Sequence, residues 1–125
     1  MRPVILVIDD SKAVRSLVRK ALAGFDCLIN EAANGYDGLH AMERAMPDLL
    51  LIDVRMPVMD GVELLTMLKS KDELKVIPVV MLTATTDKAD LPLIGRLGVQ
   101  GMIQKPFTGT ELVQAVQAAI TLAVK

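Results

Sequence analysis

The sequence contains few aromatic residues and almost no cysteine. Its 125 residues include two Phe, one Tyr and no Trp, so aliphatic side chains and the eight methionines must fill the core. The single cysteine, Cys27, excludes a disulfide within the chain and is typical of a protein from a reducing compartment. Hydrophobic residues still make up 52% of the chain, which excludes a mainly disordered polypeptide.

A charge excess and long hydrophobic runs are also missing. The formal net charge is −1, so the chain lacks the basic excess that non-specific nucleic-acid binding requires. The apolar runs reach four or five residues, far short of a membrane span, and the first begins at Val4, which leaves no room for a signal peptide. We therefore expect a cytoplasmic protein that binds neither nucleic acid nor membrane directly and forms one domain over residues 1–125.

Short apolar segments alternate with amphipathic stretches along the chain. The apolar segments predict strands at residues 4–8, 27–32, 49–52, 78–82 and 101–103. Helical periodicity follows each strand, and two helices open on capping-box pairs, Asp60 with Glu63 and Thr108 with Glu111. Five strand–helix units in succession predict a parallel sheet with helices on both faces.

The composition of the strands predicts their order in the sheet. The first, third and fourth strands are almost continuously apolar, as central strands buried on both faces should be, whereas the second and fifth are more polar. The order 2-1-3-4-5 satisfies this pattern. The fold class we expect is therefore a three-layer α/β/α sandwich with a five-stranded parallel sheet of the flavodoxin-like arrangement.

The fourth helix has the weakest helical signal. It must fit between Asp87 and Gly98, and that segment contains Pro92 and Gly95. Proline is tolerated only in the first helical turn, and a helical glycine costs roughly 1 kcal/mol relative to alanine. We expect this helix to begin near Asp90 and to be short or loosely held.

Polar residues with matching chemistry follow four of the predicted strands. Asp9 and Asp10 follow the first strand, Asp53 the third, Thr83 the fourth and Lys105 the fifth. Ligands of open parallel sheets bind beyond the carboxyl ends of the strands, so these side chains should converge. Two unit charges about 4 Å apart repel by about 4 kcal/mol at an effective dielectric of about 20, so the carboxylates require a cation or a proton.

The expected cation is Mg²⁺, which prefers one or two carboxylates with waters and a phosphate. Asp53 would then be a nucleophile toward a phosphoryl group, with Lys105 and the Thr83 hydroxyl binding the phosphoryl oxygens. Each residue alone also has an ordinary interpretation: Asp9 and Asp10 could cap the first helix, and the others could be a strand-end acid, a turn threonine and a solvated lysine. Their occurrence at four strand ends favours the functional interpretation.

Four segments carry a resemblance to a known family. The segments "ILVIDDS", "LLLIDVRMPVMDG", "PVVMLTA" and "IQKPF" resemble those of the CheY-like receiver domain of two-component response regulators, and the match covers the whole chain. The resemblance implies that Asp53 is the phosphoacceptor of a phosphorelay. It also implies that Asp10, Asp53 and the backbone carbonyl of Arg55 ligate Mg²⁺, and that Asp9 lies in the outer part of the acidic pocket and reaches the metal through water.

The same resemblance implies how the signal leaves the site. Thr83 would move to bond the phosphoryl oxygen, Lys105 would pair with Asp53 and then with its phosphoryl group, and the Lys105–Pro106 bond would be cis. The family usually has an aromatic switch residue three positions before the lysine, where this chain has Met102.

The resemblance also implies the partners. The phosphodonor would be a sensor histidine kinase or a histidine phosphotransfer protein. The output surface would be the fourth helix, fifth strand and fifth helix, which would contact a downstream protein or form a weak dimer of an otherwise monomeric chain. The protein would catalyse only its own phosphorylation and dephosphorylation, and Arg55 and Thr85, flanking the phosphoryl group, would affect the hydrolysis rate.

Several alternatives stay open. A haloacid-dehalogenase-type phosphatase would need a second acid where Arg55 stands, and a flavodoxin-like flavin binder would need a phosphate loop where Asp9 and Asp10 stand. A receiver that acts only as an interaction module, without phosphorylation, is a third interpretation. The chain could also be the receiver of a longer regulator, although its two ends slightly favour a stand-alone protein.

Overall fold

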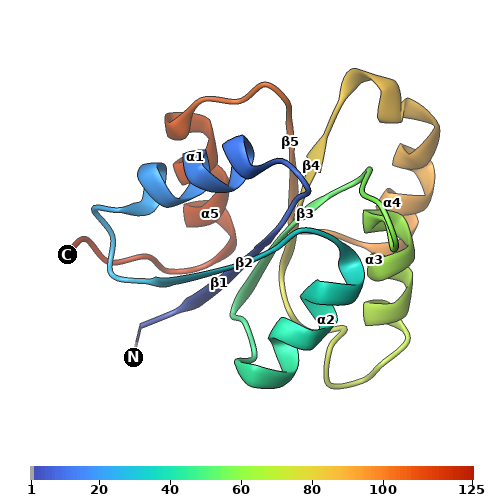
Figure 1. The fold of residues 1–125 in the computed structure, drawn as a ribbon, viewed down its shortest axis with the longest axis horizontal. Helices are drawn as coiled ribbons and strands as arrows, with labels where there is room; N and C mark the ends of the chain where they lie inside the picture. The colour runs from blue at the N-terminus through green and yellow to red at the C-terminus, as the bar shows by residue number, and fades with distance from the viewer. Residues whose placement is uncertain (1) are drawn as a thin grey trace.

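The computed structural model describes residues 2–125 as five strands and five α-helices (Figure 1). The strands are β1 (Val4–Ile8), β2 (Leu28–Ala32), β3 (Leu49–Asp53), β4 (Val79–Thr83) and β5 (Gly101–Gln104). The helices are α1 (Lys12–Leu22), α2 (Gly35–Arg44), α3 (Gly61–Lys69), α4 (Leu91–Leu97) and α5 (Gly109–Ala119), and the 3₁₀ helix η1 (Thr85–Asp90) precedes α4. All strand pairs are parallel and the order is β2-β1-β3-β4-β5, which confirms the predicted topology.

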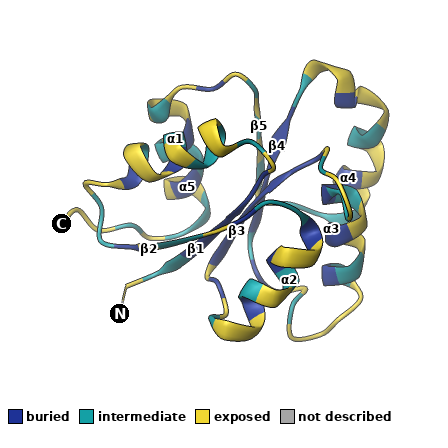
Figure 2. Cartoon of the chain, viewed as in Figure 1, coloured by how far each residue is buried: buried dark blue, intermediate teal, exposed yellow. Residues whose placement is uncertain are grey.

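Helices cover both faces of the sheet, with α1 and α5 on one face and α2, α3 and α4 on the other (Figure 1). Alternate residues of β1 supply the two cores: Ile5 and Val7 pack toward α1 and α5, and Leu6 and Ile8 pack toward the other three helices. This period of two explains why the central strands read as continuous apolar runs. The central strands are accordingly dark blue in Figure 2, which colours the chain by burial.

Side-chain caps define where four of the helices begin. Ser11, Asn34, Asp60 and Thr108 are the N-caps of α1, α2, α3 and α5, and each accepts a hydrogen bond from a backbone N–H three residues on. Both predicted capping boxes form. Because Ser11 caps α1, Asp9 and Asp10 are free of the capping role that was the alternative interpretation for them.

The strand bounds and the burial of the methionines differ from the prediction. The strands β3, β4 and β5 each run one residue further, and β2 and β4 begin one residue later, at Leu28 and Val79. Asp53 and Thr83 are therefore the last residues of strands instead of the first residues after them. The methionines are not all core residues: Met42 and Met81 are buried, but Met46 and Met102 are about half exposed.

The α4 region is the least buried part of the helical layers. As predicted, α4 is short, with seven residues, and Ile94 is its one fully buried side chain. Leu93 on α4 and Met102 on β5 remain substantially exposed. This edge is part of the expected output surface.

The two ends of the described chain lie close to the loop between α1 and β2. The Arg2 guanidinium pairs with Asp26 at 2.9 Å, and the Asp26 N–H donates to the Ala123 carbonyl at 2.7 Å. Within residues 2–125, no helix is both long and apolar enough to cross a membrane.

Candidate functional site

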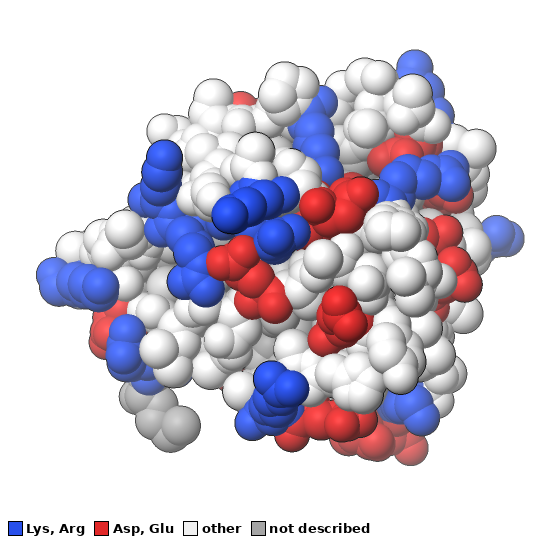
Figure 3. All heavy atoms as spheres, viewed as in Figure 1, with Lys and Arg blue, Asp and Glu red and all other residues white. Residues whose placement is uncertain are grey.

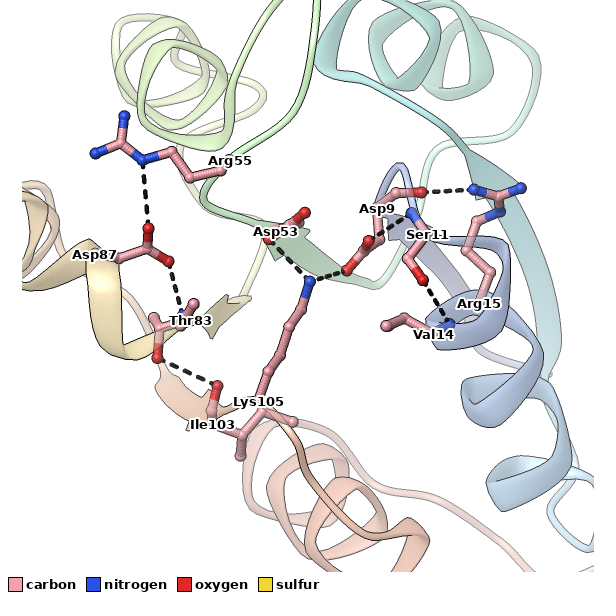
Figure 4. Close-up of polar contacts among 11 residues, drawn as sticks. Asp9, Ser11, Val14, Arg15, Asp53, Arg55, Thr83, Asp87, Ile103 and Lys105 are labelled. Atoms are coloured by element: carbon pink, nitrogen blue, oxygen red, sulfur yellow. Dashed lines mark hydrogen bonds and ion pairs between the residues drawn. The ribbon is translucent and has the colours of Figure 1, made fainter.

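Three carboxylates and one ammonium group meet at the carboxyl edge of the sheet. The Lys105 Nζ lies 2.7 Å from Asp9 Oδ2 and 3.0 Å from Asp53 Oδ1, so its side chain joins the ends of three strands (Figure 4). Oxygens of Asp9, Asp10 and Asp53 all lie within 4.8 Å of one another. The structure therefore brings together the acids and the lysine that the strand ends predicted. Figure 3 shows acidic side chains near the middle of one face, with basic side chains close by.

Backbone and arginine contacts fix the orientation of Asp9. Its Oδ1 accepts a hydrogen bond from the Ser11 N–H at 2.8 Å, and its backbone carbonyl accepts one from the Arg15 guanidinium at 2.7 Å. The Arg15 Nε lies in turn 2.8 Å from Oε1 of Glu31, a residue of the edge strand β2. The acid pair after β1 is thus tied to both α1 and β2.

The loop after β3 is held close to Asp53 by a glycine. The Gly61 N–H donates to the Val54 carbonyl at 2.9 Å, and a Cβ at this position would collide with the Asp53 carbonyl oxygen. Only glycine permits this approach of α3 to the strand end. The Asp–Gly pair of the motif therefore combines a helix cap, Asp60, with a steric requirement at Gly61.

The three acids of the site differ in burial, and the difference is not the one that the resemblance implies. Asp9 has no exposed surface and Asp53 is 5% exposed, whereas Asp10 is exposed. The expectation that Asp9 occupies the outer part of the pocket is therefore wrong. Asp9 is the inner acid because its side chain turns back toward Lys105 and the Ser11 N–H, leaving Asp10 at the rim.

Burial and like charges control the protonation of the site. Loss of solvent around Asp53, and secondarily repulsion by Asp9, raises its pKa to about 6 against the opposing pull of Lys105. Burial alone would lower the pKa of Lys105, but hydrogen bonds and attraction from Asp9 and Asp53 outweigh it, so its pKa is raised. Lys105 is therefore a permanent cation at neutral pH, and one cation faces three acids.

The donor set fits a hard divalent cation. The possible metal ligands are carboxylate oxygens of Asp9, Asp10 and Asp53. Among residues 2–125, the buried Asp9 Oδ2 accepts no hydrogen bond and is met only by the Lys105 ion pair. Mg²⁺ favours a few carboxylates with the remaining positions left to water and phosphate. The exposed Asp10 leaves such an ion open to solvent.

Thr83 lies near the site but does not face it. Its hydroxyl donates to the Ile103 carbonyl at 3.4 Å, on the side away from Asp53 (Figure 4). The Lys105 N–H donates to the Thr83 carbonyl at 2.6 Å, and the peptide bond from Lys105 to Pro106 is cis, the form that the resemblance implies.

The Arg55 side chain also points away from Asp53. It pairs with Asp87 at 3.3 Å and with Asp90 at 2.7 Å, both on η1. Sequence reasoning missed Asp87, Asp90 and Arg15 as neighbours of the site. Arg55 lies in the loop after β3 and Asp87 on η1, 32 residues further along the chain, and no local sequence pattern reveals that they meet.

Comparison with known proteins agrees with this geometry. Fold and site define a flavodoxin-like α/β domain in which charged side chains gather at the carboxyl edge of a parallel sheet. More specifically, the model of the response regulator receiver domain matches residues 5–117, and the chain belongs to this family of two-component signalling domains.

Relatives and solved structures share the receiver region. The chain is 34% identical over 120 residues to the DNA-binding transcriptional regulator NtrC of Escherichia coli, with 96% of this chain and 25% of NtrC covered. It is 35% identical over 122 residues to the DNA-binding response regulator MtrA of Mycolicibacterium paratuberculosis, with 96% and 52% covered. The structure of the chemotaxis response regulator CheY4 of Vibrio cholerae superimposes with a TM-score of 0.87 at 28% identity, with 96% of this chain and all of that chain covered. The chain thus spans a quarter to about half of these two curated relatives.

Proposed function

We propose that this chain accepts a phosphoryl group on Asp53 in a Mg²⁺-dependent reaction and passes the signal to a partner protein from its α4–β5–α5 surface. The observation that carries this proposal is the Lys105 ammonium held between Asp53 and Asp9. A cation fixed beside a nucleophilic carboxylate neutralises charge on an incoming phosphoryl group.

The bonds that form and break in the transfer step involve the Asp53 carboxylate and a phosphohistidine donor. An Asp53 oxygen attacks phosphorus and forms the P–O bond of an acyl phosphate, while the P–N bond to the donor imidazole breaks. The electron pair of that bond stays on the imidazole nitrogen, which takes up a proton. Asp53 must be ionised for this attack, which it mostly is at neutral pH with a pKa of about 6.

The remaining site residues have supporting roles in the proposal. Asp10, Asp53 and the Arg55 backbone carbonyl would hold Mg²⁺, with Asp9 acting through water, and the ion when bound would supply positive charge to the phosphoryl oxygens. Lys105 orients the phosphoryl group. Later hydrolysis by water restores the carboxylate, so the chain catalyses only reactions of its own phosphoryl group.

The signal then leaves through Thr83 and β5. The Thr83 hydroxyl exchanges its long bond to the Ile103 carbonyl for a phosphoryl oxygen, because an anionic acceptor makes the stronger hydrogen bond. Met102, half exposed on β5, takes the place of the usual aromatic switch residue.

Receiver domains interact with histidine kinases and downstream targets, and we propose both kinds of partner for this chain. The donor is a sensor histidine kinase or a histidine phosphotransfer protein, and it docks on an apolar hollow beside Lys105 lined by Ala13, Val14, Leu17, Pro106 and Phe107. The output partner is a protein, or a second copy in a weak dimer. Residues 1–125 act in the cytoplasm as one domain, either alone or as the receiver of a longer regulator.

Labelling with a small phosphodonor tests the proposal. Incubation with acetyl phosphate and Mg²⁺ should add the mass of one phosphoryl group, and hydroxylamine should remove it, as expected for an acyl phosphate. Asp53→Asn should abolish the adduct and EDTA should prevent it, while Asp37→Asn, an exposed acid on α2, should label normally. Folded wild-type protein that takes up no phosphoryl group would favour a phosphorylation-independent interaction module.

A further inference from the structure

The Arg55 side chain connects the loop after Asp53 to the segment that leads into α4. Its guanidinium lies 3.3 Å from Asp87 Oδ1 and 2.7 Å from Asp90 Oδ2, and the Arg55 side chain is 61% exposed. Figure 4 shows Arg55 directed toward Asp87 and away from Asp53. Because most of this side chain is in solvent, packing does not prevent it from adopting another rotamer.

The ion pair matters more to the buried Asp87 than to the exposed Arg55, because only Asp87 would be left as a charge without solvent. The Asp87 side chain is 1% exposed, its Oδ2 accepts from the Ala84 N–H at 2.7 Å, and Arg55 is its one ion-pair partner within residues 2–125. A buried carboxylate that loses its cation must be hydrated or move, since an unpaired buried charge is strongly unfavourable. The pairing of Arg55 therefore decides whether η1 can stay in its observed position.

We propose that Arg55 is a positioning residue that exchanges partners: it holds Asp87 and Asp90 while Asp53 is free, and turns to the phosphoryl group once Asp53 carries one. This inference rests on the proposed phosphorylation of Asp53. Arg55 follows Asp53 by two residues, and a phosphoryl group brings −1.5 to −2 charges and a geometry that guanidinium binds in a bidentate manner.

The exchange would release the segment that is least firmly held. Without Arg55, Asp87 loses its cation and the 84–90 segment opens to hydrate the carboxylate. The helix that follows is short and buries a single side chain fully, Ile94, so little packing resists the movement. Arg55 thereby couples the phosphorylation site to one edge of the output surface, in addition to the route through Thr83.

Hydrogen–deuterium exchange of residues 84–97 tests the inference. In unphosphorylated protein, Asp90→Asn removes the shorter ion pair at constant size and should speed exchange of this segment about two- to fivefold. Asp72→Asn is the matched control, because Asp72 is 93% exposed and pairs with Lys75, away from Arg55. Arg55→Gln removes the cation, and with it the ion pairs to both Asp87 and Asp90, so it should also speed hydrogen–deuterium exchange of this segment.

Phosphorylation supplies the second half of the test, with intact mass reporting the adduct after acetyl phosphate and Mg²⁺. Phosphorylation should speed hydrogen–deuterium exchange of residues 84–97 in the wild type and in the Asp72→Asn control. The increase should be smaller in Asp90→Asn, because this variant has already lost one of the two ion pairs. Equal exchange of unphosphorylated Asp90→Asn and Asp72→Asn would overturn the holding role. Equal increments on phosphorylation in all three proteins would overturn the partner exchange.

The two failures are distinguishable. Wild-type protein without the phosphoryl adduct would contradict the proposed function and the partner exchange with it. The comparison of unphosphorylated Asp90→Asn with Asp72→Asn would still decide whether Arg55 holds η1.

Discussion

Asp53 combines a reactive position with an electrostatic cost to the folded state. Its pKa is raised from 3.8 to about 6, by burial first and by Asp9 second. For an acid whose folded pKa is raised, stability increases as pH falls from about 6 toward 3.8, because the folded state binds the proton more tightly. At pH 7 the ionised carboxylate therefore opposes folding when no metal is present.

Asp53→Asn should consequently stabilise the metal-free protein. We expect the free energy of unfolding in EDTA at pH 7 to rise by roughly 1–3 kcal/mol, because the amide keeps the size of the side chain and carries no charge. Urea denaturation of the variant and wild type measures the difference, which should shrink at pH 4. A variant less stable than wild type at pH 7 would show that the Lys105 pairing outweighs burial.

Val58 is strained in the loop after β3. Its φ is +69°, in the left-handed region that β-branched residues avoid, and the residue is 79% exposed, so its side chain gains little from packing. Val58→Gly should relieve the strain and raise the free energy of unfolding by roughly 0.5–1 kcal/mol, after the entropy that glycine adds to the unfolded chain. Val58→Ala, which keeps a Cβ, should gain less. Loss of stability on Val58→Gly would contradict the strain argument.

At the scale of the element, α1 is tied to the edge strand β2 through one acid. Glu31 accepts hydrogen bonds from Arg19 and from Arg15, and these contacts, the Arg19 hydrogen bond foremost, lower its pKa below 4.5. For a lowered acid pKa, the stabilisation is complete above the unfolded pKa and is lost as pH falls through the folded one. The linkage therefore acts on the acid side of about pH 4.5.

Glu31→Gln should reveal this linkage in the pH dependence of unfolding. We expect a loss of about 0.5–1 kcal/mol at pH 7, kept small by solvent screening of a partly exposed pair, and no difference near pH 3. Denaturation at both pH values, with Glu43→Gln as an exposed control, measures it. A constant difference across this range would indicate lost packing instead of lost charge.

The start of α1 also tests the proposed donor surface. Ala13 is exposed and lines the apolar hollow beside Lys105, so Ala13→Gln should fold normally and place a polar chain where the donor docks. We expect phosphotransfer from a kinase or phosphotransfer protein to slow about tenfold or more, with labelling by acetyl phosphate unchanged. Ser16→Gln, exposed on the same helix but absent from the lining of the hollow, is the control. Equal slowing by both donors would indicate damage to the acid site.

The elements themselves were predictable because their determinants are local. Caps such as Asp60 and Thr108 start helices wherever a periodic apolar face follows, and the continuous run of β3 requires burial on both faces. The burial of Asp9 was not predictable. Asp9 and Asp10 are neighbours in the sequence, and which of them turns inward depends on Lys105, which reaches Asp9 from the end of β5. The orientation of Arg55 also escaped prediction, because its rotamer depends on Asp87, a neighbour that is distant in the sequence.

At the scale of the whole molecule, the same central strands carry the site residues and the two hydrophobic cores. β1 and β3 carry Asp9 and Asp53 at their ends and supply side chains to both hydrophobic clusters, so separating the acids requires disrupting the centre of the fold. A ligand bound between these strand ends therefore stabilises the entire domain. A change of charge at this site should therefore alter the stability of the whole domain.

Magnesium should accordingly raise the global stability of the protein. Mg²⁺ at about 100 times its dissociation constant should add about 2.7 kcal/mol to the free energy of unfolding, measured by urea denaturation against NaCl of equal ionic strength. Asp10→Asn should remove most of this increment with little effect on the metal-free fold, because Asp10 is exposed at the rim of the pocket. Glu43→Gln, which changes another exposed acid, should respond to Mg²⁺ like the wild type. If Mg²⁺ stabilised Asp10→Asn and wild type equally, the metal would be bound elsewhere, and the acids at the strand ends would have to be neutralised by Lys105 and protons alone.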